Sequence, residues 1–527
     1  MHDVIVIGGG HNGLIASAFL AKAGLKVVLL ERTDRVGGCA RTSDLAPGFR
    51  CPTLAHMAAI DPAIVRSLGL ERHGLRIIRP DAHACAPTED GRALVLWADA
   101  SRATEEIRAF STKDADHYPR FLASFGAIAG VLRRVCEMVP PALDDPNAAD
   151  LIQLLSTGRK FRALGKADAY RLLRWMPMAV ADLVGEWFES EPLRATIAAG
   201  GLTGAFLGPW SAGSAAILLL LGAGEGHPVA TGWFAGGGPG ALATALASAA
   251  QAAGVEIRTS ADVARIDVTE DAAGGIALTT GEQIAARAVV SGADPKRTLL
   301  GLLDPVHLAP DFVHRVQNIR AHGTLAKVNY AVSATPRFAG LSARDAHQQA
   351  SALSGRVRLA RDIDGIERAF DEAKYGGFAD APWIEIAIPS IADPSLAPNG
   401  QHVVSAYVQY APYHLRGHWD AERERLGDVA TRTIERYAPG FASTVIAREV
   451  ITPLDLETTY GLTGGHIFHG ELALDQLFVA RPLLEWARYA TPIRHLYLCS
   501  SGTHPGTGLD GRSGALAART IARALKH

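Results

Sequence analysis

The first thirty residues place two short apolar runs on either side of a helical segment. Residues 4–7 form a fully apolar, branched run that ends in glycines, as buried parallel strands do. Residues 14–23 are rich in alanine and leucine and stop at Gly24, a residue type that often follows a helix end. Residues 26–31 return to a strand pattern. This order predicts a βαβ unit in a doubly wound sheet that binds its ligand at the carboxyl ends of the strands.

Similar strand patterns recur far along the chain, at residues 255–258, 288–291 and 496–499. A chain of 527 residues is long enough for two lobes, because single cores stop growing at about 250–300 residues. The stretch 101–200 has a mostly helical pattern, whereas 320–450 mixes strand runs, such as 325–332 and 402–410, with helices. We therefore predict an α/β fold with a discontinuous Rossmann-like domain (1–100, 212–300 and 455–527) and an inserted α+β substrate lobe (101–211 and 301–454).

Charge and composition narrow the function classes. The 52 Lys and Arg residues nearly balance 54 Asp and Glu residues, so no global field favours nucleic acid. The five cysteines are scattered without a close pair, which favours a reducing compartment and excludes disulfide reductase chemistry. Residues 1–7 lack a secretory leader pattern, and the longest apolar run, 212–223, is shorter than the roughly 20 residues of a spanning helix. We expect a cytoplasmic protein that at most contacts the inner face of a membrane.

One helical stretch leaves two interpretations open. Residues 159–188 mix basic side chains with leucine, methionine and tryptophan. This composition is typical of a helix that lies on a membrane surface, but also of an ordinary helix with one solvated face.

The turn after the first strand satisfies the pattern G-x-G-x-x-G, with Gly8, Gly10 and Gly13 at its glycine positions and His11 and Asn12 between them. The first glycine permits a tight turn, the second lets the backbone approach a pyrophosphate, and the third lets helix and strand pack closely. The helix N-terminus supplies amide donors for the phosphates. Glu31, at the end of the second strand, is placed to accept hydrogen bonds from the adenosine ribose.

The segment that follows selects the dinucleotide. Glu31 and Arg32 precede a second glycine pair, Gly37-Gly38, and then Arg41. This arrangement resembles the E-R-x(4)-G-G-x-x-x-T pattern of two-domain FAD oxidoreductases. The resemblance implies FAD as cofactor and a domain of the amine-oxidase type.

Two further segments resemble the phytoene desaturase family of carotenoid oxidoreductases, including its β-carotene ketolase branch and the pyridine nucleotide-disulfide oxidoreductase domain-containing proteins. They are residues 233–242 (WFAGGGPGAL) and 496–506 (LYLCSSGTHPG). The resemblance implies that Gly502 passes beside the isoalloxazine, that amides from Gly508 to Gly511 face its pyrimidine end, and that Val263 meets the adenine through its backbone. It also places His504 at the flavin, as a candidate catalytic residue or as a buttress of its loop.

These features predict an FAD-dependent dehydrogenase or oxidase that abstracts a hydride from carbon of a largely apolar substrate, such as a carotenoid or another lipid, and passes electrons to oxygen or a quinone. The alternatives are an amine or amino-acid oxidase, and a flavoprotein that uses FAD structurally and acts through partners. His466 and His469 lack a third ligand at metal-binding spacing, so no metal is expected.

Overall fold

The computed structural model describes residues 2–229 and 232–526. Its first sheet is parallel in the order β9-β2-β1-β12-β18, and a hairpin of β10 and β11 extends antiparallel from β12. The strands are β1 (His2–Ile7), β2 (Val27–Leu30), β9 (Glu256–Arg258), β10 (Val263–Thr269), β11 (Ala272–Leu278), β12 (Gln283–Ser291) and β18 (Leu496–Leu498). The predicted βαβ unit and the discontinuous Rossmann-like domain are confirmed, because strands from both ends and the middle of the chain share this sheet.

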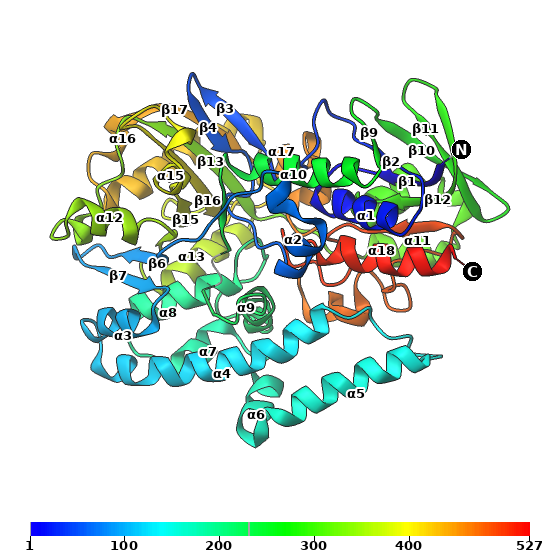
Figure 1. Ribbon diagram of the computed structural model, residues 1–527. Helices are drawn as coiled ribbons and strands as arrows, with labels where there is room; N and C mark the ends of the chain where they lie inside the picture. The colour runs from blue at the N-terminus through cyan, green and yellow to red at the C-terminus, as the bar shows by residue number, and fades with distance from the viewer. Residues whose placement is uncertain (1, 230–231, 527) are drawn as a thin grey trace.

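Both faces of the first sheet are covered, which explains its continuous apolar strands. Helices α1 (His11–Lys22), α10 (Pro239–Ala252) and α18 (Arg512–Ala524) pack on one face (Figure 1). Val4 and Val6 point into that core, whereas Ile5 and Ile7 point into the core on the opposite face. Helix α11 (Pro310–Gln317) contributes to this second core.

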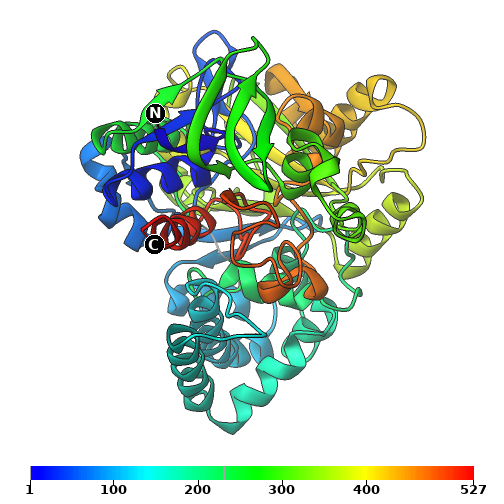
Figure 2. The ribbon, with the colours of Figure 1, turned by 90° about the vertical axis from the view of Figure 1, so that its right-hand side faces the viewer.

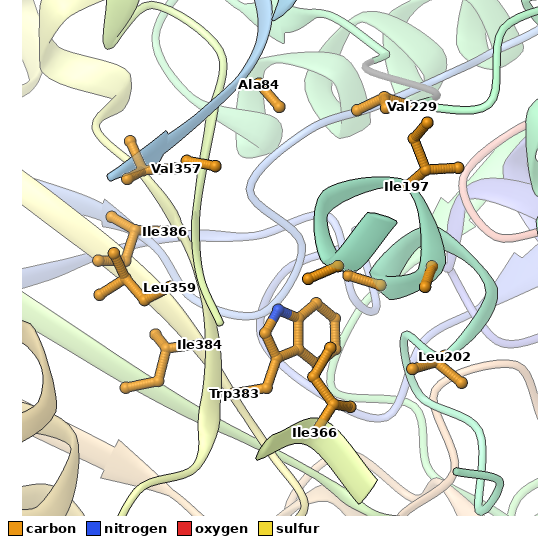
Figure 3. Close-up of a cluster of buried hydrophobic side chains, with 14 of the residues drawn as sticks. Ala84, Ile197, Leu202, Val229, Val357, Leu359, Ile366, Trp383, Ile384 and Ile386 are labelled. Atoms are coloured by element: carbon orange, nitrogen blue, oxygen red, sulfur yellow. The ribbon is translucent and has the colours of Figure 1, made fainter. Parts of the chain in front are cut away.

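The second sheet is mostly antiparallel, in the order β17-β13-β16-β15-β14-β6-β7, with only β14 and β6 parallel. Its strands are β6 (Ala82–Pro87), β7 (Ala93–Trp97), β13 (Leu325–Val332), β14 (Arg356–Leu359), β15 (Trp383–Ala387), β16 (His402–Gln409) and β17 (Val445–Ile451). Figure 3 shows part of the core on this sheet, where Trp383 lies beside Ile366 and Leu202.

The sheet pairing departs from the expected domain bounds in two places. Strands β6 and β7 fall within 1–100 yet pair in the second sheet. Helix α9 (Ser214–Gly222) falls within 212–300 yet packs in the core of the second lobe. An apolar run predicts a strand or a buried helix. Which sheet the strand joins, or which core the helix packs in, depends on segments hundreds of residues away in the chain.

The predicted helical stretch 101–200 is confirmed as α3 (Ala100–Arg108), α4 (Thr112–Cys136), α5 (Ala148–Ala163), α6 (Gly165–Trp175), α7 (Val180–Gly185) and α8 (Glu191–Ala198). Among the described residues, no helix has the length and apolar character needed to cross a bilayer. The remaining elements are β3 (Thr42–Ala46), β4 (Phe49–Pro52), α2 (Pro62–Leu68), β5 (Ile77–Ile78), β8 (Phe234–Ala235), α12 (Ala346–Ala352), α13 (Ile363–Lys374), α14 (Pro389–Ala392), α15 (Trp419–Tyr437), α16 (Phe441–Thr444) and α17 (Pro453–Thr458), besides short 3-10 and π turns.

Candidate functional site

A cavity of about 410 Å³ lies between the two sheets. The turn after β1 and the end of β2 line it from the first sheet, with Gly10 and Glu31 among the lining residues. Strands β13 and β16 line it from the second sheet, with Lys327 and Tyr407. The cavity therefore lies at the carboxyl ends of the parallel strands, where doubly wound sheets bind their ligands.

The glycine fingerprint has the geometry that a pyrophosphate requires. A Cβ atom added to Gly10 would meet no atom within 4 Å, whereas one added to Gly13 would lie 2.1 Å from the carbonyl oxygen of Gly8. Gly8 itself has a φ of +95°. No side chain caps the N-terminus of α1, and its first turn holds no acidic residue. Open space above Gly10 and uncapped amides at a helix N-terminus fit a bound diphosphate.

Glu31 is held rigidly at the edge of the cavity. Its carboxylate accepts hydrogen bonds from the amide of Gly9 (2.8 Å) and from the amide and hydroxyl of Thr33 (3.0 and 2.8 Å). The guanidinium of Arg41 lies 3.7 Å away. The carboxylate is thus oriented in part by the backbone of the fingerprint itself.

The second glycine pair packs against the first. The amide of Gly37 donates to the carbonyl of Gly9 (2.8 Å), and a Cβ on Gly38 would lie 3.1 Å from the Cα of Gly10. Both glycines have positive φ, +135° and +56°. Of the predicted residues in this region, Gly38, Arg32, Arg41 and Val263 line the cavity, whereas Gly37 supports the turn.

The loop before α18 is tied to the fingerprint. His11 Nε2 lies 3.2 Å from the carbonyl oxygen of Gly508, and Asn12 Nδ2 donates to the hydroxyl of Ser501 (3.1 Å). Gly508 lines the cavity, whereas Gly502 and Gly511 do not. Cβ atoms on Gly502 and Gly511 would lie only 2.3 and 2.4 Å from the side chains of Pro295 and Ile15. These two glycines permit close packing behind the cavity.

Of the two roles expected for His504, its position favours support of the loop over chemistry at the flavin. Its Nε2 lies 3.0 Å from the carbonyl oxygen of Val135 in α4, and its ring meets Phe478 edge-on. The side chain does not line the cavity. Burial lowers the pKa of His504 to about 4, so the neutral ring donates to Val135 and supports the loop.

A buried lysine that sequence reasoning missed lines the cavity instead. Lys327 Nζ lies 2.9 Å from Nδ1 of His56 and 4.3 Å from the ring centre of Tyr407. Burial lowers the pKa of Lys327 to about 7. Burial and the neighbouring Lys327 lower the pKa of His56 to about 3, so His56 Nδ1 is a neutral acceptor for Nζ. The sequence held one signal for this buried lysine, namely its position within the otherwise mostly apolar strand pattern of residues 325–332.

Behind this lysine, Glu385 bridges two arginines. Arg358 Nε donates to its carboxylate at 2.9 Å, Arg356 Nη1 donates to the other oxygen, and His56 Nε2 lies 3.7 Å away. Burial alone would raise the pKa of Glu385, but Arg356 and Arg358 hold it well below its ordinary value. Both arginines line the cavity. The second sheet therefore presents cations to the cavity, with their counter-charge buried behind them.

Residues 187–522 match the model of a family described as flavin containing amine oxidoreductase, and residues 6–64 match an NAD(P)-binding Rossmann-like domain. The chain belongs to the flavin-containing amine oxidoreductase family. It is 36% identical to pyridine nucleotide-disulfide oxidoreductase domain-containing protein 2 of Rattus norvegicus, over 100% of this chain and 94% of the relative. The phytoene desaturase resemblance is confirmed by 28% identity to phytoene desaturase (lycopene-forming) of Pseudescherichia vulneris, over 97% of this chain and 96% of that one.

The chain is also similar to another curated relative and to a solved structure. It is 27% identical to one of the subunits of limonene dehydrogenase from Castellaniella defragrans, over 99% of this chain and 94% of the relative. The fold matches wild-type putrescine oxidase bound to putrescine, with a TM-score of 0.59 at 14% identity, over 100% of this chain and 99% of that one. At that identity the match supports the fold alone.

The cofactor of this family member is FAD, and the protein is an FAD-dependent oxidoreductase of the amine-oxidase type. When bound, the flavin supplies an acceptor for a hydride. Gly10 and the start of α1 would hold the diphosphate, and Glu31 the adenosine ribose. Lys327 can hold a proton at Nζ on the opposite wall of the cavity.

Proposed function

We propose that this enzyme removes a hydride from carbon of a largely apolar substrate, such as an isoprenoid or another lipid, docked between the two sheets. The observation that carries the proposal is the sign of the charges on the second sheet. Lys327, Arg356 and Arg358 all face the cavity and are all basic. An amine substrate arrives as an ammonium ion, which the permanently charged Arg356 and Arg358 would repel, whereas a hydrocarbon meets no such repulsion.

Apolar side chains and the names of relatives support the same substrate class. The cavity is also lined by Leu54, Leu221, Leu462, Ile467 and Phe468. Two relatives are named for limonene and phytoene. By analogy with those names, we infer a substrate whose reacting carbon lies in a hydrocarbon part.

Lys327 gives the proposed reaction a place for its proton. Converting two neighbouring C–H groups into a double bond, or an alcohol into a carbonyl, releases one hydride and one proton. A bound FAD would accept the hydride together with both electrons of the C–H bond. The proton goes to Nζ of Lys327, whose pKa of about 7 lets it accept a proton at neutral pH.

This assignment predicts a pH dependence. Flavin reduction should become faster as the pH rises through about 7, because only the unprotonated Nζ of Lys327 accepts a proton. Lys327→Met should slow reduction by on the order of 10²–10⁴-fold and remove the step, with FAD content unchanged. Rapid-mixing measurements of anaerobic flavin reduction from pH 5.5 to 9 give both the pH dependence and the effect of Lys327→Met. Lys26→Met is the control, because Lys26 is an exposed lysine. A pH step that survives in Lys327→Met would contradict the role.

The same pKa shift affects stability with a defined sign. The pKa of Lys327 in the folded protein, about 7, lies below its ordinary value of 10.5. Between these values the unfolded chain binds more protons, so the contribution of Lys327 to the free energy of unfolding increases with pH in this window. Lys327→Met should lack that increase.

A substrate panel tests the proposed function. The FAD-loaded protein is mixed anaerobically with isoprenoid alkenes, long-chain alcohols, polyamines and amino acids, and loss of the flavin absorbance is followed. Bleaching by the apolar compounds supports the proposal. Bleaching by amines alone, with substrate-dependent peroxide in air, would establish an amine oxidase instead. A flavin that no compound in the panel reduces, in a protein whose flavin dithionite does reduce, would point to a structural cofactor.

A second measurement identifies the electron acceptor. The bleached enzyme is mixed with oxygen or with a quinone, and the compound that restores the flavin absorbance is the acceptor.

A further inference from the structure

Helices α5 and α6 form a hairpin that projects from the body of the molecule. Figures 1 and 2 show α5, in cyan, along the lower edge with little of the chain beside it. Of the sixteen residues of α5, only Asp150 is buried. The hairpin therefore lies largely on the surface. Core packing does not explain the apolar residues on its exposed side.

Six large apolar side chains of the hairpin are exposed, and we call this set the hairpin surface. Ile152, Leu155 and Leu173 are 66%, 65% and 62% exposed. The full set is Leu151, Ile152, Leu154, Leu155, Tyr170 and Leu173. Single exposed leucines are ordinary in proteins, but six large apolar side chains exposed on one helical hairpin favour an interaction site.

Helix α5 contacts the body through few apolar side chains. Asp150 pairs with Arg488 at 2.8 Å, Ser156 Oγ accepts from Arg134 at 3.2 Å, and Phe161 near the end of the helix packs against the core. These contacts hold Ile152 and Leu155 outward. A surface helix normally turns its apolar side toward the core, so this arrangement exposes apolar area that a partner would bury.

The hairpin is also strongly basic. Residues 148–175 hold six Lys and Arg residues against two Asp residues, a net charge of +4 in a chain whose total is −2. Arg159, Lys160, Arg162 and Lys166 are exposed, and within residues 2–229 and 232–526 none of these four takes part in an ion pair. Unpaired cations beside exposed leucines complement a surface that is both anionic and apolar.

We propose that the hairpin surface binds a bilayer that contains anionic phospholipid. Leu151, Ile152 and Leu155 enter the boundary between headgroups and acyl chains, and the basic residues at the end of α5 contact the phosphates. A second copy of the chain fits this surface less well, because each hairpin would bring its own net positive charge to the other. The inference does not depend on the substrate proposed above.

Vesicle sedimentation of the FAD-loaded protein tests the proposal. We expect binding to phosphatidylcholine vesicles that contain phosphatidylglycerol, weak binding to phosphatidylcholine alone, and partial release by salt. The double variant Ile152→Ser, Leu155→Ser should bind at least about 30-fold more weakly, because two buried aliphatic groups are lost. Arg159→Gln with Lys160→Gln should weaken binding about 5-fold for each cation removed.

Matched variants separate this surface from general effects. Val306 and Ile446, 77% and 50% exposed, lie outside the hairpin, so Val306→Ser with Ile446→Ser should bind vesicles as the wild type does. All variants should keep full FAD content. Equal binding to both vesicle types, or unchanged binding of the hairpin variants, would overturn the proposal. So would a dimer in solution that Ile152→Ser, Leu155→Ser dissociates while vesicles remain unbound, since the surface would then join two copies of the chain.

Discussion

Replacement of Gly10 by valine is expected to give a folded protein that does not hold FAD. A Cβ atom at Gly10 meets nothing within 4 Å, and its φ of −68° and ψ of 169° suit any residue. The added side chain enters only the space at the start of α1 where the diphosphate would lie. We expect the FAD dissociation constant to rise by at least about 100-fold, since the phosphate can no longer approach the amides.

Absorbance of the purified protein and titration with FAD measure this effect, and circular dichroism reports the fold. Gly130→Val is the control, because Gly130 also has open space around it but lies in α4, outside the set of cavity residues. Gly13→Ala should instead impair folding, because its Cβ would lie 2.1 Å from the carbonyl oxygen of Gly8. Normal FAD content in Gly10→Val would place the diphosphate elsewhere.

Glu385→Gln is expected to destabilise the protein strongly. The carboxylate is fully buried and accepts hydrogen bonds from Arg356 and Arg358. Removing its charge leaves the buried guanidinium of Arg358 without its carboxylate, a change that typically costs about 3–5 kcal/mol of unfolding free energy. The midpoint of chemical denaturation at saturating FAD, followed by intrinsic fluorescence, measures the loss.

The pH dependence of this effect has a defined sign. The folded pKa of Glu385 lies well below its ordinary value of 4.5, so its stabilising contribution is complete above that value and is lost as the pH falls toward the folded pKa. Glu385→Gln should therefore flatten the acid side of the stability profile. Asp267→Asn, which breaks an exposed pair with Arg265, should change stability by no more than about 1 kcal/mol. Equal effects of the two substitutions would rule out a special role for the buried carboxylate.

The sequence was sufficient for the nucleotide-binding half of the site. Gly8, Gly10 and Gly13 act within six consecutive residues, and their roles follow from local geometry: a positive φ, an open approach and a close helix–strand contact. Glu31 follows one helix and one strand later. Interactions of such short range leave a readable spacing, which is why the βαβ unit and a bound dinucleotide were predictable, whereas FAD in particular was indicated by the resemblance of residues 31–42 to FAD oxidoreductases.

The substrate half was not predictable, because its parts come from separate regions of the chain. His56, Lys327, Glu385 and Tyr407 meet only when a loop after β4 packs against β13, β15 and β16. For His504 the sequence left a catalytic and a supporting role open. Only the tertiary structure shows that α4, from the other lobe, supplies its hydrogen-bond acceptor.

The sequence alone therefore determined the Rossmann-like unit and the two-lobe plan, since these rest on local periodicity and a compact motif, and it indicated FAD through its resemblance to FAD oxidoreductases. The tertiary structure decided which sheet β6 and β7 join, which side chains line the cavity, and which face of α5 points outward. The physical reason is the separation along the chain of the residues that interact. Backbone conformation and helix or strand periodicity are encoded by near neighbours, whereas burial, the lowered pKa of Lys327 and the orientation of a helix depend on contacts between residues far apart in the chain.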